Sequence, residues 1–192
     1  MTETKILIVY YSKHGNTAKM ANLIARGVES VGNTTAILRT VSIQEDMQTM
    51  DPIVSLQDLN DCDGLILGSP ARFGNMAAPL KAFIDDTGTQ WISGKLVDKP
   101  AAVFTSSSSL HGGQETTLIT MMLPLLHHGM IVVGLPYTEK SLLTTESGGT
   151  PYGPSHWSGL DSDRVIDKHE KSLCIALGKR VATIAVKQKV GT

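Results

Sequence analysis

The sequence has few cysteines, few aromatic residues and no excess of either charge. Cys62 and Cys174 are the two cysteines in 192 residues, and neither belongs to a Cys-x-x-Cys pair. We therefore expect two reduced core residues rather than a disulfide. Lys and Arg total 17 against 18 Asp and Glu, for a formal net charge of -1. The chain therefore has no basic stripe of the kind that binds nucleic acid or an anionic membrane surface.

Long apolar runs and metal-ligand spacings are also missing. No segment approaches the roughly 18 continuous apolar residues of a membrane span, and the short apolar run after Lys5 is wrongly flanked for a signal peptide. His127 and His128 are adjacent rather than four residues apart, so no metal site is expected. A chain of this length and composition predicts a single domain, residues 1–192, in a cytoplasmic protein without membrane insertion.

Five short apolar segments, each ended by Gly, Pro or Ser, read as buried strands. They lie at 6–11, 34–41, 64–69, 101–107 and 130–135. Helical spacing of apolar residues predicts helices from about Asn16, over Pro79–Asp86, over Glu115–His127 and from about Asp163 to Lys189. Pro124 should kink or shorten the third helix, and Ser162 should cap the fourth. The alternation predicts a doubly wound parallel α/β sheet, with 144–159 as its longest loop.

The first strand runs into the turn Ser-Lys-His-Gly-Asn-Thr at 12–17, and a helix follows at once. Such a turn places backbone N–H groups and the hydroxyls of Ser12 and Thr17 at the positive end of a helix dipole. The turn lacks the G-x-G-x-x-G of dinucleotide folds and the G-x-x-x-x-G-K-[ST] of nucleotide triphosphatases. It predicts a monophosphate site, although an ordinary helix cap uses the same residue types.

Two further segments, 70–74 and 105–113, follow the third and fourth predicted strands and are also rich in small and hydroxyl residues. Ligands of doubly wound sheets bind beyond the carboxyl ends of the strands, where the strand order reverses. The first of these segments offers a planar cation at Arg72, and Phe73 or Trp91 is available to stack, so it suits a flat heterocycle. A surface turn anchored by Phe73 is the simpler alternative.

Five motifs, in order along the chain, resemble the WrbA family of FMN-dependent NAD(P)H:quinone oxidoreductases, which are relatives of flavodoxin. They are S-K-H-G-N-T at 12–17, G-S-P-A-R-F-G-N-M-A-A-P at 68–79, F-T-S-S-S-S-L-H-G-G-Q-E-T-T at 104–117, L-L-H-H-G-M at 125–130 and G-G-T-P-Y-G at 148–153. The resemblance implies a flavodoxin-like three-layer α/β/α sandwich with a five-stranded parallel sheet. It also implies a homotetramer (a dimer of dimers) in which neighbouring subunits complete each site.

The same resemblance implies the functional residues. Those implied to bind FMN are Ser12, Lys13, His14, Gly15, Asn16, Thr17, Pro70, Ala71, Arg72, Phe73, Gly74, Thr105, Ser106, Ser107, Ser108, Leu110, Gly112, Gly113 and His127. The residues implied to face the substrate are Trp91, Phe73 and His127, with Trp91 coming from a neighbouring subunit. His127 is also the implied catalytic group, which polarises or protonates a quinone oxygen. Two residues depart from the family pattern. Ala71 stands where relatives often carry Thr, and His14 stands where some carry Tyr.

The implied reaction is two-electron, ping-pong reduction of a quinone such as p-benzoquinone, with NAD(P)H as the donor. The alternative is a flavodoxin-like electron carrier without a substrate of its own. Carriers usually dock through a strongly acidic surface, and a net charge of -1 argues against one. A role as an interaction protein finds no support, because the chain has no basic element or recognition-helix signature.

Overall fold

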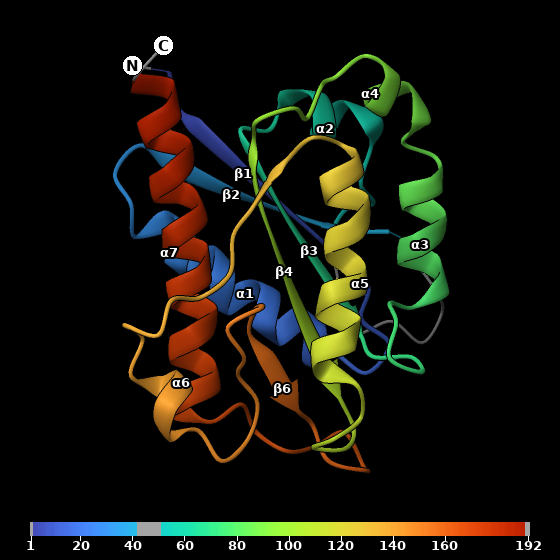
Figure 1. The fold of residues 1–192 in the computed structure, drawn as a ribbon, viewed down its shortest axis with the longest axis vertical. Helices are drawn as coiled ribbons and strands as arrows, with labels where there is room; N and C mark the ends of the chain where they lie inside the picture. The colour runs from blue at the N-terminus through green and yellow to red at the C-terminus, as the bar shows by residue number, and fades with distance from the viewer. Residues whose placement is uncertain (1, 42–50, 191–192) are drawn as a thin grey trace.

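The computed structural model describes residues 2–41 and 51–190. Its centre is a parallel sheet (Figure 1). The strand order is β2-β1-β3-β4-β5. The strands are β1 (Thr4–Tyr10), β2 (Thr34–Thr40), β3 (Gly64–Pro70), β4 (Pro100–Ser107) and β5 (Ile131–Val132). A further strand, β6 (Ser155–Trp157), pairs in parallel with the outer part of β4.

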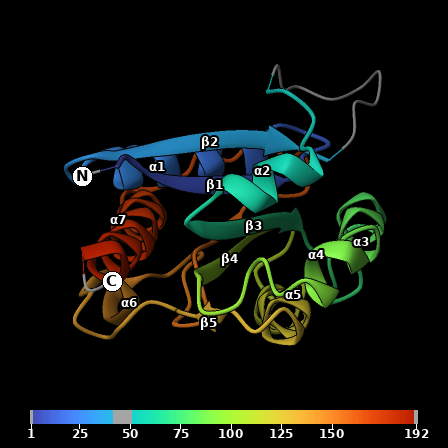
Figure 2. The same ribbon diagram turned by 90° about the horizontal axis from the view of Figure 1, so that it is seen from above.

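Helices cover both faces of the sheet, in three layers (Figure 2). Side chains alternate along β1, so Ile6, Ile8 and Tyr10 belong to one buried core, while Leu7 and Val9 belong to the other. The first core includes residues of α1 (Asn16–Glu29) and α7 (Lys168–Val190). The second includes residues of α2 (Leu56–Asp61), α3 (Ala78–Asp85) and α5 (Gln114–His127). Because both faces are covered, the inner parts of the central strands are apolar, and polar residues appear towards the carboxyl ends of β3 and β4.

Two glycines bring α1 and α7 into direct backbone contact. A Cβ added to Gly27 would lie 2.1 Å from the carbonyl oxygen of Ile175, and one added to Gly178 would lie 2.0 Å from that of Ile24. Both distances are far below any contact that a real side chain makes, so neither position accepts alanine without moving a helix. The contact is reciprocal, each helix presenting one glycine to the backbone of the other.

The sheet confirms the predicted architecture and corrects its outer edge. The fifth strand is shorter than predicted, because only Ile131 and Val132 pair, and they pair with the start of β4. Because β5 does not reach the outer part of β4, β6 pairs with that part instead. The segment 144–159 is thus not a plain loop as predicted, since it contains β6 as well as the end of the short helix α6 (Ser141–Thr144).

Two helix predictions were wrong in detail. The last helix begins at Lys168 rather than near Asp163, so Ser162, which has a left-handed φ of 59°, lies too far before it to act as its cap. Asp167 caps this helix instead, since its Oδ1 accepts bonds from the N–H groups of His169 and Glu170 at 2.8 and 3.0 Å. Pro124 does not shorten α5, which continues to His127 while Leu125 remains buried in the core.

Three short helices were not predicted: α2, α4 (Gly88–Ile92) and α6. Ser55 and Asp58 form a reciprocal capping box at the start of α2. Within the described ranges, no helix is long and apolar enough to cross a membrane.

Candidate functional site

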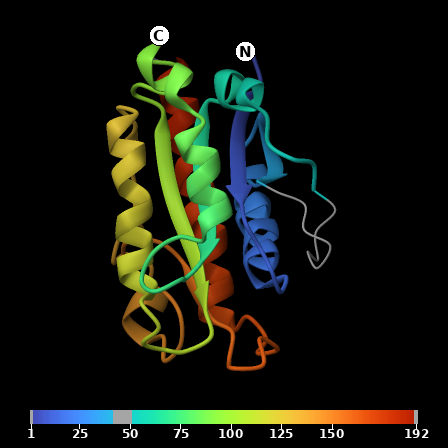
Figure 3. The same cartoon turned by 90° about the vertical axis from the view of Figure 1, so that its right-hand side faces the viewer.

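The loops after β1, β3 and β4 gather at one end of the sheet, the carboxyl end of the strands (Figure 3). They enclose a cavity of about 250 Å³. Ten predicted residues line it: Ser12, Lys13, His14, Asn16, Thr17, Pro70, Arg72, Ser106, Ser107 and Ser108. The strand order reverses between β1 and β3, so the cavity lies at the expected switch point.

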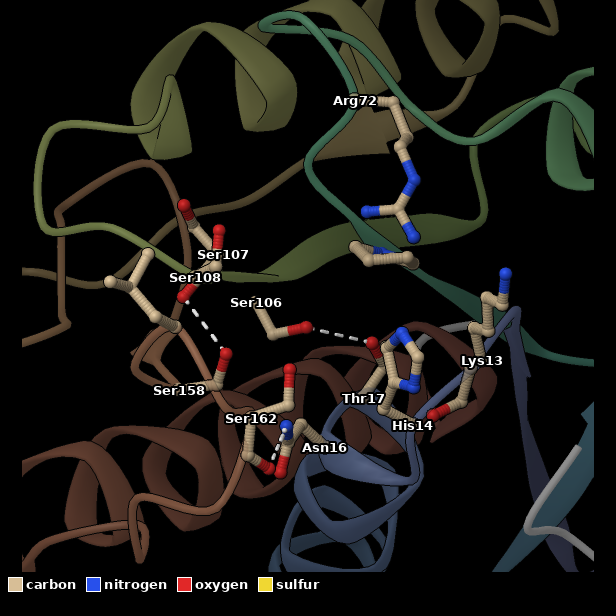
Figure 4. A pocket seen from close by; sticks show the side chains of 13 residues that line it. Lys13, His14, Asn16, Thr17, Arg72, Ser106, Ser107, Ser108, Ser158 and Ser162 are labelled. Carbon is tan, nitrogen blue, oxygen red and sulfur yellow. Dashed lines mark hydrogen bonds between the residues drawn. The ribbon is translucent and has the colours of Figure 1, made fainter.

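The first loop is shaped by Gly15, whose φ of 81° is left-handed and lets the chain turn into α1. The first N–H groups of a helix have no partner within it, and Ser12 Oγ accepts one of them, from Ala18, at 3.2 Å. Thr17 Oγ1 and Ser106 Oγ lie 2.9 Å apart, which joins the first loop to the end of β4 (Figure 4). Hydroxyls from two loops therefore meet beside the helix N-terminus.

The charge of the cavity is positive. Lys13, His14 and Arg72 are its ionisable side chains, and no Asp or Glu stands among the described residues that line it. The dipole of α1 adds partial positive charge at the same place. Positive charge, hydroxyls and helix N–H groups together suit a phosphate or another small anion.

The second loop is a tight, strained turn. Arg72 N donates to Asn75 O at 2.8 Å, and Asn75 N returns a bond to Arg72 O at 3.0 Å. Both central residues have positive φ, 51° at Phe73 and 74° at Gly74. A bulky residue rarely adopts this conformation, and such strain is concentrated at functional sites. The turn leaves the Phe73 ring fully exposed, with a relative exposure of 108%.

The remaining predicted residues of these loops do not line the cavity. Thr105 is fully buried and donates to Ser69 O at 2.7 Å, and Ala71 contributes its N–H to Ser106 O at 2.8 Å. Leu110 and Gly113 line a second cavity of about 490 Å³ instead. Gly112 is a packing position, because a Cβ there would lie 2.1 Å from Ser107 Oγ.

One wall of the cavity was missed from the sequence. Ser158, Leu160 and Ser162 line it, and all three come from the segment between β6 and α7. Asn16 Nδ2 donates to Ser162 O at 2.9 Å, which joins this wall to α1 (Figure 4). Ser158 lies in the predicted loop 144–159, but no pattern there distinguished it, and Leu160 and Ser162 lie just beyond that loop.

Two carboxylates support that wall from behind. Burial alone would raise the pKa of Glu170, yet hydrogen bonds from His156 and from the N–H groups of Asp167 and Trp157 hold it below its ordinary value. Burial likewise opposes ionisation of Asp167, but bonds from Ser147, from the N–H groups of Glu170 and His169, and from Arg164 lower its pKa to about 2. Both groups are therefore ionised at neutral pH.

Trp91 and His127, the residues implied to face the substrate, lie at the opposite end of the sheet. Trp91 Nε1 donates to the carbonyl oxygen of His127 at 2.9 Å. His127 ends α5, whose first residue, Gln114, directly follows the third loop. Fourteen helical residues separate the two helix ends by about 20 Å. The pair therefore stands apart from the cavity of its own chain.

The strand order and the cavity at its switch point define a flavodoxin-like α/β protein. Residues 4–139 match the family described as NADPH-dependent FMN reductase. The chain is 40% identical to an NAD(P)H dehydrogenase (quinone) of Trichlorobacter lovleyi, over 96% of this chain and 98% of the relative. It is also 40% identical to a protein of the same name from Solidesulfovibrio magneticus, over 93% and 96% of the two chains.

Solved structures agree with these relatives. The flavodoxin, WrbA-like protein from Agrobacterium tumefaciens has a TM-score of 0.72 and 25% identity, over 96% of this chain and 99% of that one. A flavodoxin from the domain Archaea, 21% identical with a TM-score of 0.66, shares the fold. The chain belongs to the NADPH-dependent FMN reductase family and, within it, to the WrbA-like proteins.

Proposed function

We propose that the protein is an FMN-dependent NAD(P)H:quinone oxidoreductase that reduces quinones such as p-benzoquinone to hydroquinones in a two-electron, ping-pong reaction. The observation that carries this proposal is the cavity at the carboxyl end, which combines serine and threonine hydroxyls with Lys13 and Arg72 and has no carboxylate among its described lining residues. The names of the relatives support the reaction class.

The residues fit the phosphate end of FMN. Ser12, Asn16, Thr17 and Ser106 offer hydrogen-bonding groups at the N-terminus of α1, and Lys13 supplies compensating charge. A volume of about 250 Å³ is smaller than the cavities of whole drug-sized ligands, so the enclosed part takes a phosphate and part of a chain. When bound, FMN supplies the redox centre that passes two electrons from the nicotinamide nucleotide to the quinone.

The protein's own residues bind and orient. Arg72 lines the cavity, and the exposed Phe73 follows it in the same tight turn. We propose that both border the flat ring of the cofactor. Trp91 and His127 are remote from this cavity within one chain. We therefore propose that they act on the site of a neighbouring subunit in a homotetramer, where His127 holds a proton near a quinone oxygen.

Steady-state kinetics test the proposal. The protein is purified with added FMN, and oxidation of NADH and NADPH is followed while p-benzoquinone is varied. Parallel double-reciprocal lines are expected for a ping-pong reaction, and the ratio of the two kcat/KM values gives the nucleotide preference. Absence of bound FMN and of quinone-dependent oxidation would overturn the proposal. Reduction of a protein partner without quinone turnover would favour an electron carrier.

A further inference from the structure

Glu170, in the first turn of α7, has a fully buried side chain. A buried carboxylate is costly unless it is well paired. Three backbone N–H groups donate to it at 3.0 Å each, from Gly148, Trp157 and Asp167. The three donors are spread over 20 residues of chain that precede α7, so one side chain bonds the backbone of a long segment at three points.

Two side chains complete the set of partners. His156 Nδ1 lies 2.8 Å from Glu170 Oε2, and Arg164 Nη1 donates to Glu170 Oε1 at 3.2 Å. Arg164 also donates to Trp157 O at 2.8 Å and to Asp167 Oδ2 at 3.1 Å, and its guanidinium lies 4.8 Å from the centre of the Trp157 ring. Arg164 thus connects the buried carboxylate to both ends of the segment between β6 and α7.

This segment carries the wall of the cavity, yet no helix or strand forms between Trp157 and Lys168. Ser158 directly follows Trp157, and its N–H and Oγ both donate to Ser107 O, at 2.8 and 3.1 Å. Ser158 O accepts the N–H of Arg164 at 3.0 Å. The place of Ser158 therefore depends on Trp157 and Arg164, and both of these are bound to Glu170.

We propose that Glu170 is a positioning residue for the FMN site, which acts with Arg164 to hold Ser158, Leu160 and Ser162 against the N-terminus of α1. This role rests on the proposed function, because it assumes that the cavity binds FMN. A purely structural role, in which Glu170 only stabilises the start of α7, would leave cofactor affinity unchanged once stability is matched.

The experiment measures FMN affinity and amide exchange in three variants. Glu170→Gln keeps the shape but places an amide among N–H donors, so we expect FMN Kd to rise at least tenfold and the amides of 157–164 to lose protection in the apoprotein. Arg164→Gln leaves the carboxylate in place and is expected to raise Kd by severalfold. Arg164→Lys should restore only part of the affinity, because an ammonium cannot bond Trp157 O, Asp167 and Glu170 in one plane.

Asp58→Asn is the matched control. Asp58 also caps a helix and pairs with an arginine, since its Oδ1 lies 3.0 Å from Arg39 Nη2, but it belongs to α2 and does not line the cavity. We expect a loss of stability with FMN Kd unchanged within twofold. Wild-type Kd in both Glu170→Gln and Arg164→Gln would overturn the positioning role alone. A wild-type protein that does not bind FMN would overturn the proposed function, and this role with it.

Discussion

The two ends of the sheet differ in chemistry. The carboxyl end presents hydroxyls, Lys13 and Arg72 around an enclosed cavity. The amino end, where α4 and the end of α5 meet, exposes Trp91 (55%), Ile92 (81%) and Leu126 (56%). One end is thus built to hold a small anion, and the other presents apolar side chains that a larger surface could cover.

The difference explains why one set of predicted site residues falls in two places. Apart from His127, the residues implied to hold the cofactor lie in the loops at the carboxyl end, and Trp91 and His127 lie at the amino end. An exposed apolar surface is what a contact between subunits would bury, and the proposed homotetramer would bring Trp91 and His127 to a neighbouring site. The comparison supports a site shared between chains, and each of the following predictions tests one of its two halves.

The largest effect is expected at the amino end. Replacing both Trp91 and His127 by alanine should lower kcat/KM for p-benzoquinone by about 100-fold, the usual contribution of a positioned acid, while FMN remains bound. Mixing these subunits with subunits that carry Ser12→Ala and Thr17→Ala should restore part of the activity, because some sites then combine two intact halves. If the mixture shows only the summed activities of the two variants measured separately, that result would argue against shared sites. His169→Gln on α7 serves as a control.

At the carboxyl end, Thr17→Ala should weaken FMN binding by about 1–3 kcal/mol, the cost of losing a bond to a charged group. Fluorescence titration of the apoprotein with FMN measures this change. Thr120→Ala is the control, because the Thr120 hydroxyl donates to Thr117 O within its own helix, at 3.1 Å, and Thr120 does not line the cavity. Equal affinity in the two variants would contradict a phosphate at Thr17.

At very low pH, protonation of Asp167 should destabilise the carboxyl end of the sheet. The folded-state pKa of Asp167 is lowered from 3.8 to about 2, so its contribution to stability is complete above pH 4 and is lost as the pH falls towards 2. For this partly exposed group the loss amounts to about 1–2 kcal/mol. Unfolding by urea between pH 5 and 2 should show a weaker pH dependence in Asp167→Asn. If the free energy of unfolding depends on pH equally in the wild type and in Asp167→Asn, the lowered pKa of Asp167 is contradicted.

The smallest effect is expected at the amino end in mild acid. Burial and the neighbouring His127 lower the pKa of His128 below 6.5, and its buried Nδ1 has no partner among the described atoms. The unfolded chain therefore takes up this proton first, so stability should decrease as the pH falls below about 6.5. His128→Gln should flatten this decrease. The fluorescence of Trp91 in a Trp157→Phe background would report this loss of stability at low pH. The fluorescence of Trp157 in a Trp91→Phe background is the control.

The central strands could be predicted from sequence because burial on both faces leaves an unbroken apolar run, as from Ile6 to Tyr10. The outer edge could not. Ser-His-Trp at 155–157 becomes a strand only because β5 is too short to pair the end of β4, which is a property of another segment. Likewise, the start of α7 depends on which acceptor reaches its free N–H groups, and Asp167 does so rather than Ser162.

The candidate site shows the same division. Ser12 to Thr17 were predictable because a strand, a turn and a helix are contiguous in sequence. Ser158 and Ser162 reach the cavity through bonds to Ser107 and Asn16, which are 51 and 146 residues away. The left-handed φ of Phe73 was equally invisible, because phenylalanine is an unusual choice for such a turn.

The reciprocal contact of Gly27 and Gly178 has a mechanical consequence. α1 begins at the floor of the cavity, and α7 begins with the carboxylate behind its wall. Since backbone touches backbone where these helices cross, they cannot slide or tilt independently without a steric clash. The crossing therefore couples the position of the cavity floor to that of the carboxylate that supports its wall.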